Sequence, residues 1–252
     1  MKNIRKGIPS LITSLGLISG CISIVMSATQ GDLSLAGYFI LAAAFFEFLD
    51  GMAARLLHAM SEFGKQLDSL ADVVSFGVAP AMILYRLMTL SFVNTQTEAG
   101  YDVLHPGAGE WLLLGATFLV AVFSALRLAK FNLDTEQVKH FKGLPTPANA
   151  LFFTALGFLA ERGATAGMAG WIFNPWLLLA LVVLSCFLLV SNIRMFSLKF
   201  SSLAFRENGF RYAFLLVSAV LLAVYRLPGL AGVIPLYIGM SLLHSLVCRK
   251  KS

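Results

Sequence analysis

The sequence predicts an all-α protein, a polytopic membrane helical bundle of about eight transmembrane helices with both termini cytoplasmic. The first observation behind this prediction is composition: 58% of the 252 residues are hydrophobic and only 13% are charged, whereas a soluble domain carries about 25% charged residues. The second is that the apolar residues form runs of about 20, which is the length that spans a bilayer. The third is the distribution of the basic residues along the chain. We expect a single integral-membrane domain over residues 1–252.

The composition also argues against two other classes of protein. A disordered chain is poor in aromatic residues, but this one contains 21 Phe. A disulfide-stabilised scaffold needs a framework of regularly spaced cysteines, and the three present lie in or beside apolar runs: Cys21, Cys186 and Cys248. Neither class fits.

The first apolar run follows a short basic segment but is as long as a membrane span and has no evident cleavage site, so we interpret it as a helix and not as a signal peptide. A polar stretch from Asn94 to Glu110, which carries Pro106, Gly107 and Gly109, predicts an outside loop. Pro228 and Gly229 predict a tight turn between the last two helices. The expected spans are residues 9–28, 33–54, 67–93, 110–131, 145–161, 171–191, 210–226 and 230–247.

Basic residues are concentrated on one side of these expected spans. Of the 19 Lys and Arg residues, 16 fall in the N-terminal segment, the C-terminal tail and the loops on the same side; the exceptions are Arg86, Arg162 and Arg226. Because cytoplasmic loops are enriched in Lys and Arg, we place both termini in the cytoplasm. The net charge of +6 is therefore interpreted as topology and contact with anionic membrane lipids, and no nucleic-acid partner is expected.

Four carboxylates stand in or beside the second and third spans, where charges are costly and usually functional. Glu47 and Asp50 are three residues apart, and Asp68 and Asp72 are four apart, so each pair shares a helix face. A short connection makes these two helices antiparallel neighbours, so the four carboxylates converge near the cytoplasmic end. Like charges this close need compensation, and all-oxygen ligand sets favour divalent cations such as Mg²⁺, Mn²⁺ or Ca²⁺. A single carboxylate at a helix end could be a helix cap, but capping does not readily explain four carboxylates at two helical spacings.

Small residues and one arginine are interleaved with the carboxylates. Gly51, Ala54 and Gly64 leave room for a ligand or another backbone to approach closely. Arg55 lies one turn beyond Asp50, where a guanidinium can hold a phosphate. Together these residues indicate a metal-bridged diphosphate more than simple ion conduction.

The spacing Asp-x2-Asp-Gly-x2-Ala-Arg-x8-Gly-x3-Asp-x3-Asp is typical of the CDP-alcohol phosphotransferases, and this chain resembles that family. Only the first position departs, with Glu in place of Asp; the matching residues are Glu47, Asp50, Gly51, Ala54, Arg55, Gly64, Asp68 and Asp72. The wider sequence is similar to the phosphatidylserine synthase branch of the family. That similarity is carried by LDSLADVVSFGVAPA after the motif, RLAKFN at 127–132, FKGLPTPA at 141–148 and SLKF at 197–200.

The resemblance implies a six-helix core with two further helices, often assembled as a homodimer, in a bacterial-type inner membrane. It implies transfer of a phosphatidyl group from CDP-diacylglycerol to L-serine with release of CMP. Two divalent cations, Mg²⁺ or Mn²⁺, would be held by Glu47, Asp50, Asp68 and Asp72, and Asp72 would also act as the general base. The CDP-lipid site would comprise Gly51, Ala54, Arg55, Ser61, Gly64 and Thr13.

Two departures from the family pattern bear on this assignment. Glu47 has one more methylene than Asp, so it reaches a metal only if its rotamer or the helix adjusts. The N-terminal pattern Pro-Asn-x2-Thr-x2-Asn of the relatives is changed at both Asn positions, to Ser10 and Gly16, while Thr13 remains.

The acceptor pocket has the weakest basis in the sequence. Serine carries a carboxylate, so its pocket needs at least one cation, and we consider as acceptor candidates Arg127, Lys130, Asn132 and Lys142. The alternative is that these residues anchor helix ends and extend to the lipid headgroups. Arg127 is the preferred candidate because it is expected to lie deepest.

Three alternative functions remain open. Another acceptor, such as glycerol 3-phosphate, inositol phosphate or an aminoalcohol, would keep the family and change the product. An impaired variant would bind CDP-lipid without turnover because of Glu47. A cation transporter would use the carboxylates as its transport site, and this predicts carboxylates near the bilayer midplane and two repeated halves.

Overall fold

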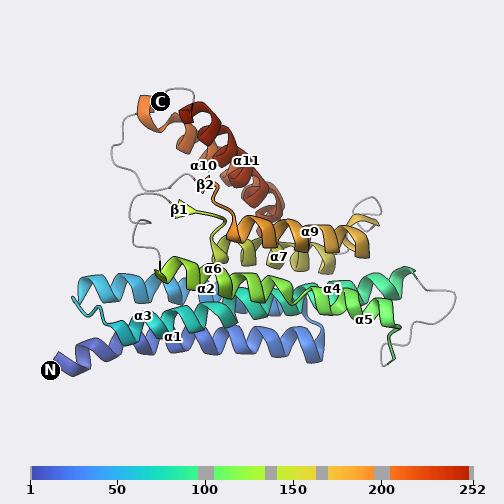
Figure 1. Cartoon of the computed structure of the whole chain (residues 1–252), viewed down its shortest axis with the longest axis horizontal. Coiled ribbons are helices and arrows are strands. Elements are labelled where there is room, and N and C mark those ends of the chain that lie inside the picture. Colours follow the sequence, from blue (N-terminus) through green and yellow to red (C-terminus); the bar gives the residue numbers. More distant parts are fainter. Residues whose placement is uncertain (1, 96–104, 134–140, 163–169, 196–204, 250–252) are drawn as a thin grey trace.

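The computed structural model describes residues 2–95, 105–133, 141–162, 170–195 and 205–249, and these residues form a helical bundle (Figure 1). The extended structure found among them is one short antiparallel pair, in which β1 (Phe141–Lys142) lies beside β2 (Arg194–Met195). The predicted helical fold is therefore confirmed, with this small pair as an addition.

The first two helices form an antiparallel pair along one side of the bundle. Helix α1 (Lys2–Val25) continues into the π-helical turn η1 (Met26–Gln30), and Gly31 ends it with a φ of 66°. Helix α2 (Leu33–Leu56) then begins after Asp32, whose side chain accepts a hydrogen bond of 2.7 Å from the backbone N–H of Leu35. This cap satisfies one of the free N–H groups at the helix start.

The third predicted span is one continuous helical rod. Helix α3 (Glu62–Asp72) passes through the π-helix η2 (Val73–Val78) into α4 (Ala79–Thr95). The rod packs against α1 at a close approach, because a Cβ added at Gly20 would lie 2.8 Å from the Cα of Ser75. The Ser75 hydroxyl donates a hydrogen bond of 3.2 Å to the carbonyl of Gly16.

The fourth predicted span is interrupted. Helix α5 (Ala108–Ala116) ends at a turn over residues 117–118, and α6 (Leu119–Leu133) follows. Helices α7 (Thr146–Glu161) and α9 (Pro175–Val190) lie alongside. Asn174 caps α9 by accepting from the backbone N–H groups of Trp176 and Leu177.

The last two helices lie oblique to the rest of the bundle (Figure 1). Helix α10 (Phe205–Tyr225) leads through the 3-10 turn η4 (Leu227–Gly229) into α11 (Leu230–Arg249). Gly229 fits against the carbonyl of Leu221, only 2.5 Å from where a Cβ would stand, so the predicted tight turn needs a glycine there.

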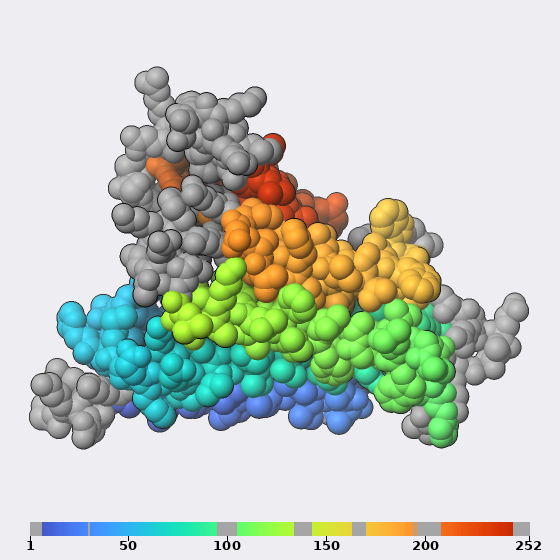
Figure 2. Space-filling model, viewed as in Figure 1, coloured from blue at the N-terminus to red at the C-terminus, as the bar shows by residue number. Residues whose placement is uncertain are grey.

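The core lies between α2, α4, α6, α7 and α9, with large buried side chains such as Phe76 and Phe153. The outer surface is also apolar. On the face shown in Figure 2, α5, α6 and α9 lie next to one another. The exposed side chains of these three helices include Leu112, Val122, Phe187 and Trp176. A surface of this kind fits hydrocarbon and not water.

Five helical segments among the described residues are long and apolar enough to cross a membrane: Gly7–Thr29, Leu33–Leu56, Glu62–Asn94, Ala108–Leu133 and Asn208–Tyr225. Two shorter apolar helices cover Pro175–Val190 and Leu227–Leu243. The chain is thus an integral membrane protein. Each of the eight predicted segments is helical, the fourth as two helices, but the count of eight spans remains a prediction, because α7 and α9 have only 16 residues each.

Candidate active site

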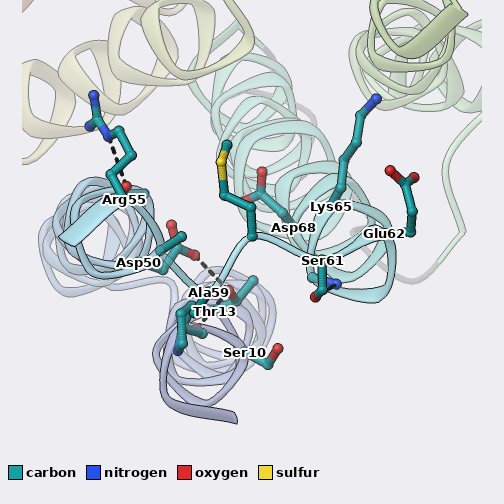
Figure 3. A pocket seen from close by; sticks show the side chains of 14 residues that line it. Ser10, Thr13, Asp50, Arg55, Ala59, Ser61, Glu62, Lys65 and Asp68 are labelled. Carbon is teal, nitrogen blue, oxygen red and sulfur yellow. Dashed lines mark hydrogen bonds between the residues drawn. The ribbon is translucent and has the colours of Figure 1, made fainter. Parts of the chain in front are cut away.

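A cleft of about 590 Å³ opens at the end of the bundle where α2 connects to α3. Figure 3 shows side chains from α1, α2 and α3 arranged around it. The lining residues are Pro9, Ser10, Thr13, Asp50, Gly51, Ala54, Arg55, Ala59, Met60, Ser61, Glu62, Gly64, Lys65 and Asp68. All six residues predicted to bind CDP-lipid are among them.

The connection that shapes the cleft is a compact turn. Its reversal uses His58 with a φ of 48°, and Ala59 packs inward and is 4% exposed. Ser61 then starts α3, because its hydroxyl accepts a hydrogen bond of 3.0 Å from the backbone N–H of Gly64. Ser61 and Gly64 therefore form the helix cap as well as lining the cleft.

Asp50 is held in place by the first helix. Its Oδ2 accepts a hydrogen bond of 2.6 Å from the hydroxyl of Thr13 (Figure 3). The Thr13 oxygen also lies 3.0 Å from the carbonyl of Pro9, one turn earlier on α1. Because Asp50 is only 7% exposed, this contact fixes a buried carboxylate between α1 and α2.

The four predicted carboxylates border one smaller cavity deeper than the cleft. Asp50 and Asp68 face both spaces, whereas Glu47 and Asp72 face only the inner cavity. Thr13, Gly16 and Ser75 also line it. Asp72 is the last residue of α3, immediately before the π-helix η2, and it is 8% exposed. The predicted convergence of the two carboxylate pairs is therefore present.

The donor chemistry of this cavity fits hard divalent cations, because all four charged groups are carboxylates. However, these carboxylates are not close enough together to form a ready metal site. Among the described residues, no three Asp, Glu, His or Cys side chains form a group that is ready to hold a metal ion. Two carboxylates come from α2 and two from α3, so a cation between these helices would draw them closer.

Donor groups surround the outer part of the cleft. Arg55 extends from α2 with its Nε donating 2.9 Å to the Gly51 carbonyl, and its exposed guanidinium still has donors for a ligand (Figure 3). Lys65 stands on α3 across the cleft. A Cβ added at Gly51 would meet nothing within 4 Å, so this surface is open. The arrangement suits an anionic ligand with two phosphates.

Arg127 is buried close to the carboxylates. It is 8% exposed, and its Nη1 donates 2.8 Å to the hydroxyl of Thr146 at the start of α7. Its charge interacts with Asp72 and Glu47. The Nε of Arg127 is buried and has no hydrogen-bond partner among the described residues. The Nε–H group is therefore available to a ligand.

The other acceptor candidates do not join this group. Lys130 donates 3.0 Å to the Asn192 side chain and 3.4 Å to the Val190 carbonyl, so it ties α6 to the end of α9. Asn132 donates 2.8 Å to the hydroxyl of Ser69 on α3. Lys142 lies in β1. Lys130 and Asn132 thus hold helices together around the site.

Ser10, Ala59 and Met60 line the cleft but are absent from the set predicted from the sequence. Ser10 stands three residues before Thr13 and so shares its helix face. The sequence could therefore have predicted that Ser10 lines the cleft, once Thr13 had been assigned to the site. Ala59 and Met60 belong to the turn between α2 and α3, and their positions depend on how that turn folds.

Comparison with known proteins supports one family. The family described as CDP-alcohol phosphatidyltransferase has a model that matches residues 6–190. CDP-diacylglycerol–serine O-phosphatidyltransferase from Bacillus subtilis is 35% identical over 153 residues, 60% of this chain and 75% of that protein. The Mycobacterium leprae protein of the same name is 36% identical over 195 residues, which are 75% of this chain and 57% of that protein. Archaetidylserine synthase from Methanothermobacter thermautotrophicus is 34% identical over 163 residues, which cover 62% and 61% of the two chains.

Proposed function

Because this chain belongs to the CDP-alcohol phosphatidyltransferase family, we propose that it is a CDP-diacylglycerol–serine O-phosphatidyltransferase, a phosphatidylserine synthase. It transfers the phosphatidyl group of CDP-diacylglycerol to L-serine and releases CMP. The observation that carries this proposal is a donor-lined cleft beside a cavity bordered by four carboxylates, the two sharing Thr13, Asp50 and Asp68 in their walls.

Serine is favoured as the acceptor by what the relatives share. Their names differ in the lipid, which is a diacylglycerol derivative in two and an archaetidyl group in the third, but all three name serine. The buried cation Arg127 supports the same choice, because the carboxylate of serine needs a positive partner.

The donor is placed with its diphosphate in the outer cleft. Arg55 and Lys65 offer positive charge to the phosphates, and Gly51 leaves space for them. The acyl chains extend into lipid, since the cleft lies at the end of helices whose outer faces are apolar. The cytidine is directed toward the cytoplasm, on the side where the sequence places most basic residues.

Transfer proceeds by direct displacement at phosphorus. Asp72 takes the proton from the serine hydroxyl, whose oxygen bonds to the phosphorus beside diacylglycerol as the bond to the CMP oxygen breaks. Asp50, fixed by Thr13, and Asp68 orient the donor from the boundary between the two spaces. Glu47, Asp50, Asp68 and Asp72 would hold the divalent cations, which when bound would neutralise charge on the diphosphate and on the departing CMP. The buried position of Asp72 limits competition by water.

An acceptor panel on the purified full-length protein tests this function. CDP-diacylglycerol and Mn²⁺ or Mg²⁺ are supplied with serine, glycerol 3-phosphate, inositol phosphate or no acceptor, and CMP release is followed. We expect release with serine alone, and its loss with EDTA. CMP release with a different acceptor would agree with the family assignment and contradict serine as the acceptor. CDP-lipid binding without any release would favour the impaired variant, and a Glu47→Asp variant that regains turnover would identify the cause.

The transporter alternative has less support. Its transport carboxylates would lie near the middle of the membrane, whereas the cleft here is bordered by the first turn of α3 and the turn that precedes it. We also propose, from the family resemblance, that the protein forms a homodimer in a bacterial-type inner membrane with the cleft facing the cytoplasm. Light scattering of the detergent-solubilised protein measures the first of these, and a monomer mass would contradict it.

A further inference from the structure

A second polar cavity lies at the other end of the bundle. Its volume is about 170 Å³, and it is formed by η1 and helices α4 and α5. The lining residues are Ser27, Ala28, Met82, Tyr85, Arg86, Thr89 and Leu114. The turn η1 ends the α1 segment, at the end of the bundle away from the N-terminus (Figure 1).

This cavity is separate from the candidate active site. Arg86 follows Asp72 by 14 positions on the continuous rod formed by α3, η2 and α4, which corresponds to roughly 21 Å along a helix. Within the described part of the chain, no residue lines both this cavity and the cleft or the carboxylate cavity. The proposed transfer reaction does not use it.

Two hydrogen-bond donors in the cavity are buried and unpaired within the described part of the chain. They are the Nε of Arg86 and the hydroxyl of Ser27, a residue that is only 1% exposed. The neighbouring hydroxyl of Thr89 is already used, since it donates 3.0 Å to the Tyr85 carbonyl. Buried donors without partners are costly, so a ligand with acceptor oxygens would relieve both.

The charge of the cavity is positive. Among the described residues that line it, Arg86 is the one cation and none is Asp or Glu. Asp32, a nearby acidic residue in the sequence, caps α2 by accepting from Leu35. The guanidinium lies against Gly31, where an added Cβ would stand 2.7 Å from Nη2 and 2.9 Å from Nε. The backbone of Gly31 thus leaves room for the guanidinium beside the cavity.

We propose that this cavity binds an oxyanion of the phosphate class, through the guanidinium of Arg86 and the hydroxyl of Ser27. The phosphate has two sources in a membrane protein: the headgroup of a phospholipid in the adjacent leaflet, or free inorganic phosphate. Both present the same acceptor oxygens and negative charge to the same two donors. The site also gives a role to Arg86, which stands on the side where the sequence has few basic residues.

Thermal unfolding of the delipidated protein in detergent tests the proposal. Unfolding is measured with inorganic phosphate, with a short-chain phosphatidylglycerol, and with chloride at matched ionic strength. An Arg55→Gln background removes a phosphate-binding side chain from the cleft. We expect phosphate, lipid or both to raise the unfolding temperature in this background, and the rise to be lost in Arg86→Gln. Stabilisation by the lipid alone identifies the headgroup as the source, and stabilisation by phosphate shows that the free ion suffices.

Two further variants make the test independent of any folding defect in Arg86→Gln. Ser27→Ala removes an unpaired buried hydroxyl, so without ligand it should be neutral or stabilising, while the ligand-induced rise should shrink. Arg162→Gln is the matched control, because Arg162 is an exposed arginine that donates to the Tyr225 carbonyl instead. It should keep the full rise. The proposal would be overturned if Arg86→Gln and Ser27→Ala showed the same ligand-induced rise in unfolding temperature as the Arg55→Gln background. It would also be overturned if neither ligand raised the unfolding temperature of that background.

Discussion

Thr13 and Asp50 show how one residue pair prepares the site. A carboxylate that is 7% exposed requires a donor, and α1 supplies the Thr13 hydroxyl at 2.6 Å. Thr13→Val keeps the shape of the side chain and removes this donor. A hydrogen bond to a charged group contributes about 1.5–3 kcal/mol, so we expect kcat/KM for CDP-diacylglycerol to fall roughly tenfold or more. Steady-state kinetics measure this, and Thr13→Ser, which keeps the hydroxyl, should retain most of the activity. Equal losses in both variants would contradict the hydrogen-bond role.

Arg127 is the residue whose substitution should separate acceptor from donor binding. Arg127→Lys keeps the charge but loses the planar set of donors that contacts Thr146. We expect a higher KM for serine and little change in the KM for CDP-diacylglycerol. Lys130→Gln is the control, because Lys130 contacts Asn192 and Val190. An effect on the donor KM alone would assign Arg127 to the CDP-lipid.

At this scale the sequence predicts residue types better than their partners. The motif spacing predicts that the four carboxylates converge beside Arg55 and Gly51, and in the structure these residues line two adjoining spaces. The sequence favours Arg127 over Lys130, three residues away on the same helix, by expected depth, and Arg127 is the buried one while Lys130 is exposed. It gives no sign of what either side chain contacts. Arg127 donates to Thr146 at the start of α7, and Lys130 donates to Asn192 just beyond the end of α9. Their hydrogen-bond partners therefore depend on where α7 and α9 pack. Such contacts come from tertiary packing and leave no local pattern.

Two glycines on neighbouring helices lead to opposite expectations. Gly51→Ala on α2 adds a methyl group to the open cleft, where nothing lies within 4 Å, so the protein should remain stable and lose donor affinity. Gly20→Ala on α1 places its methyl 2.4 Å from the Ser75 hydroxyl and 2.8 Å from the Ser75 Cα. It should separate α1 from η2 and lower the unfolding temperature, because overpacking costs about 1–3 kcal/mol.

Thermal unfolding and CDP-diacylglycerol binding, measured on the same two variants, check this prediction. Gly239→Ala on α11 is the control, since its methyl would also meet nothing within 4 Å but lies outside the cleft. It should change neither quantity. Normal donor binding by Gly51→Ala would contradict the placement of the diphosphate.

At the scale of elements, hydropathy predicts helices well but not their interruptions. The third and fourth predicted spans both occur, yet one contains the π-helix η2 and the other the turn at residues 117–118. Neither interruption contains a charged residue or a proline, so hydropathy gives no sign of a change in backbone hydrogen bonding. In η2 the change follows directly after Asp72, and π-helical turns are frequent at functional sites. The short pair between β1 and β2 is likewise set by contacts between distant segments.

The whole molecule has two chemically different ends. The candidate active-site cleft lies at the end of the bundle where α2 meets α3, and the positive cavity that contains Arg86 lies toward the opposite end. The sequence predicts that the first end is cytoplasmic.

In a background without cysteines, Glu62→Cys should react with a membrane-impermeant thiol reagent only after permeabilisation. Gly109→Cys, beyond the opposite end of α4, should react in intact cells. The reverse pattern would contradict the predicted orientation.

The measurement that tests the central claim most directly is a single turnover of CDP-diacylglycerol with saturating serine, comparing the unsubstituted protein with Asp72→Asn. The unsubstituted protein should form phosphatidylserine and CMP in equal amounts, and chelation of divalent cations should stop it. Asp72→Asn should bind the donor and slow the transfer by about 10²–10⁴-fold, as loss of a general base does. Asp32→Asn, which keeps a capping residue far from the cleft, should react at the normal rate. Transfer by Asp72→Asn at the unsubstituted rate would contradict the account.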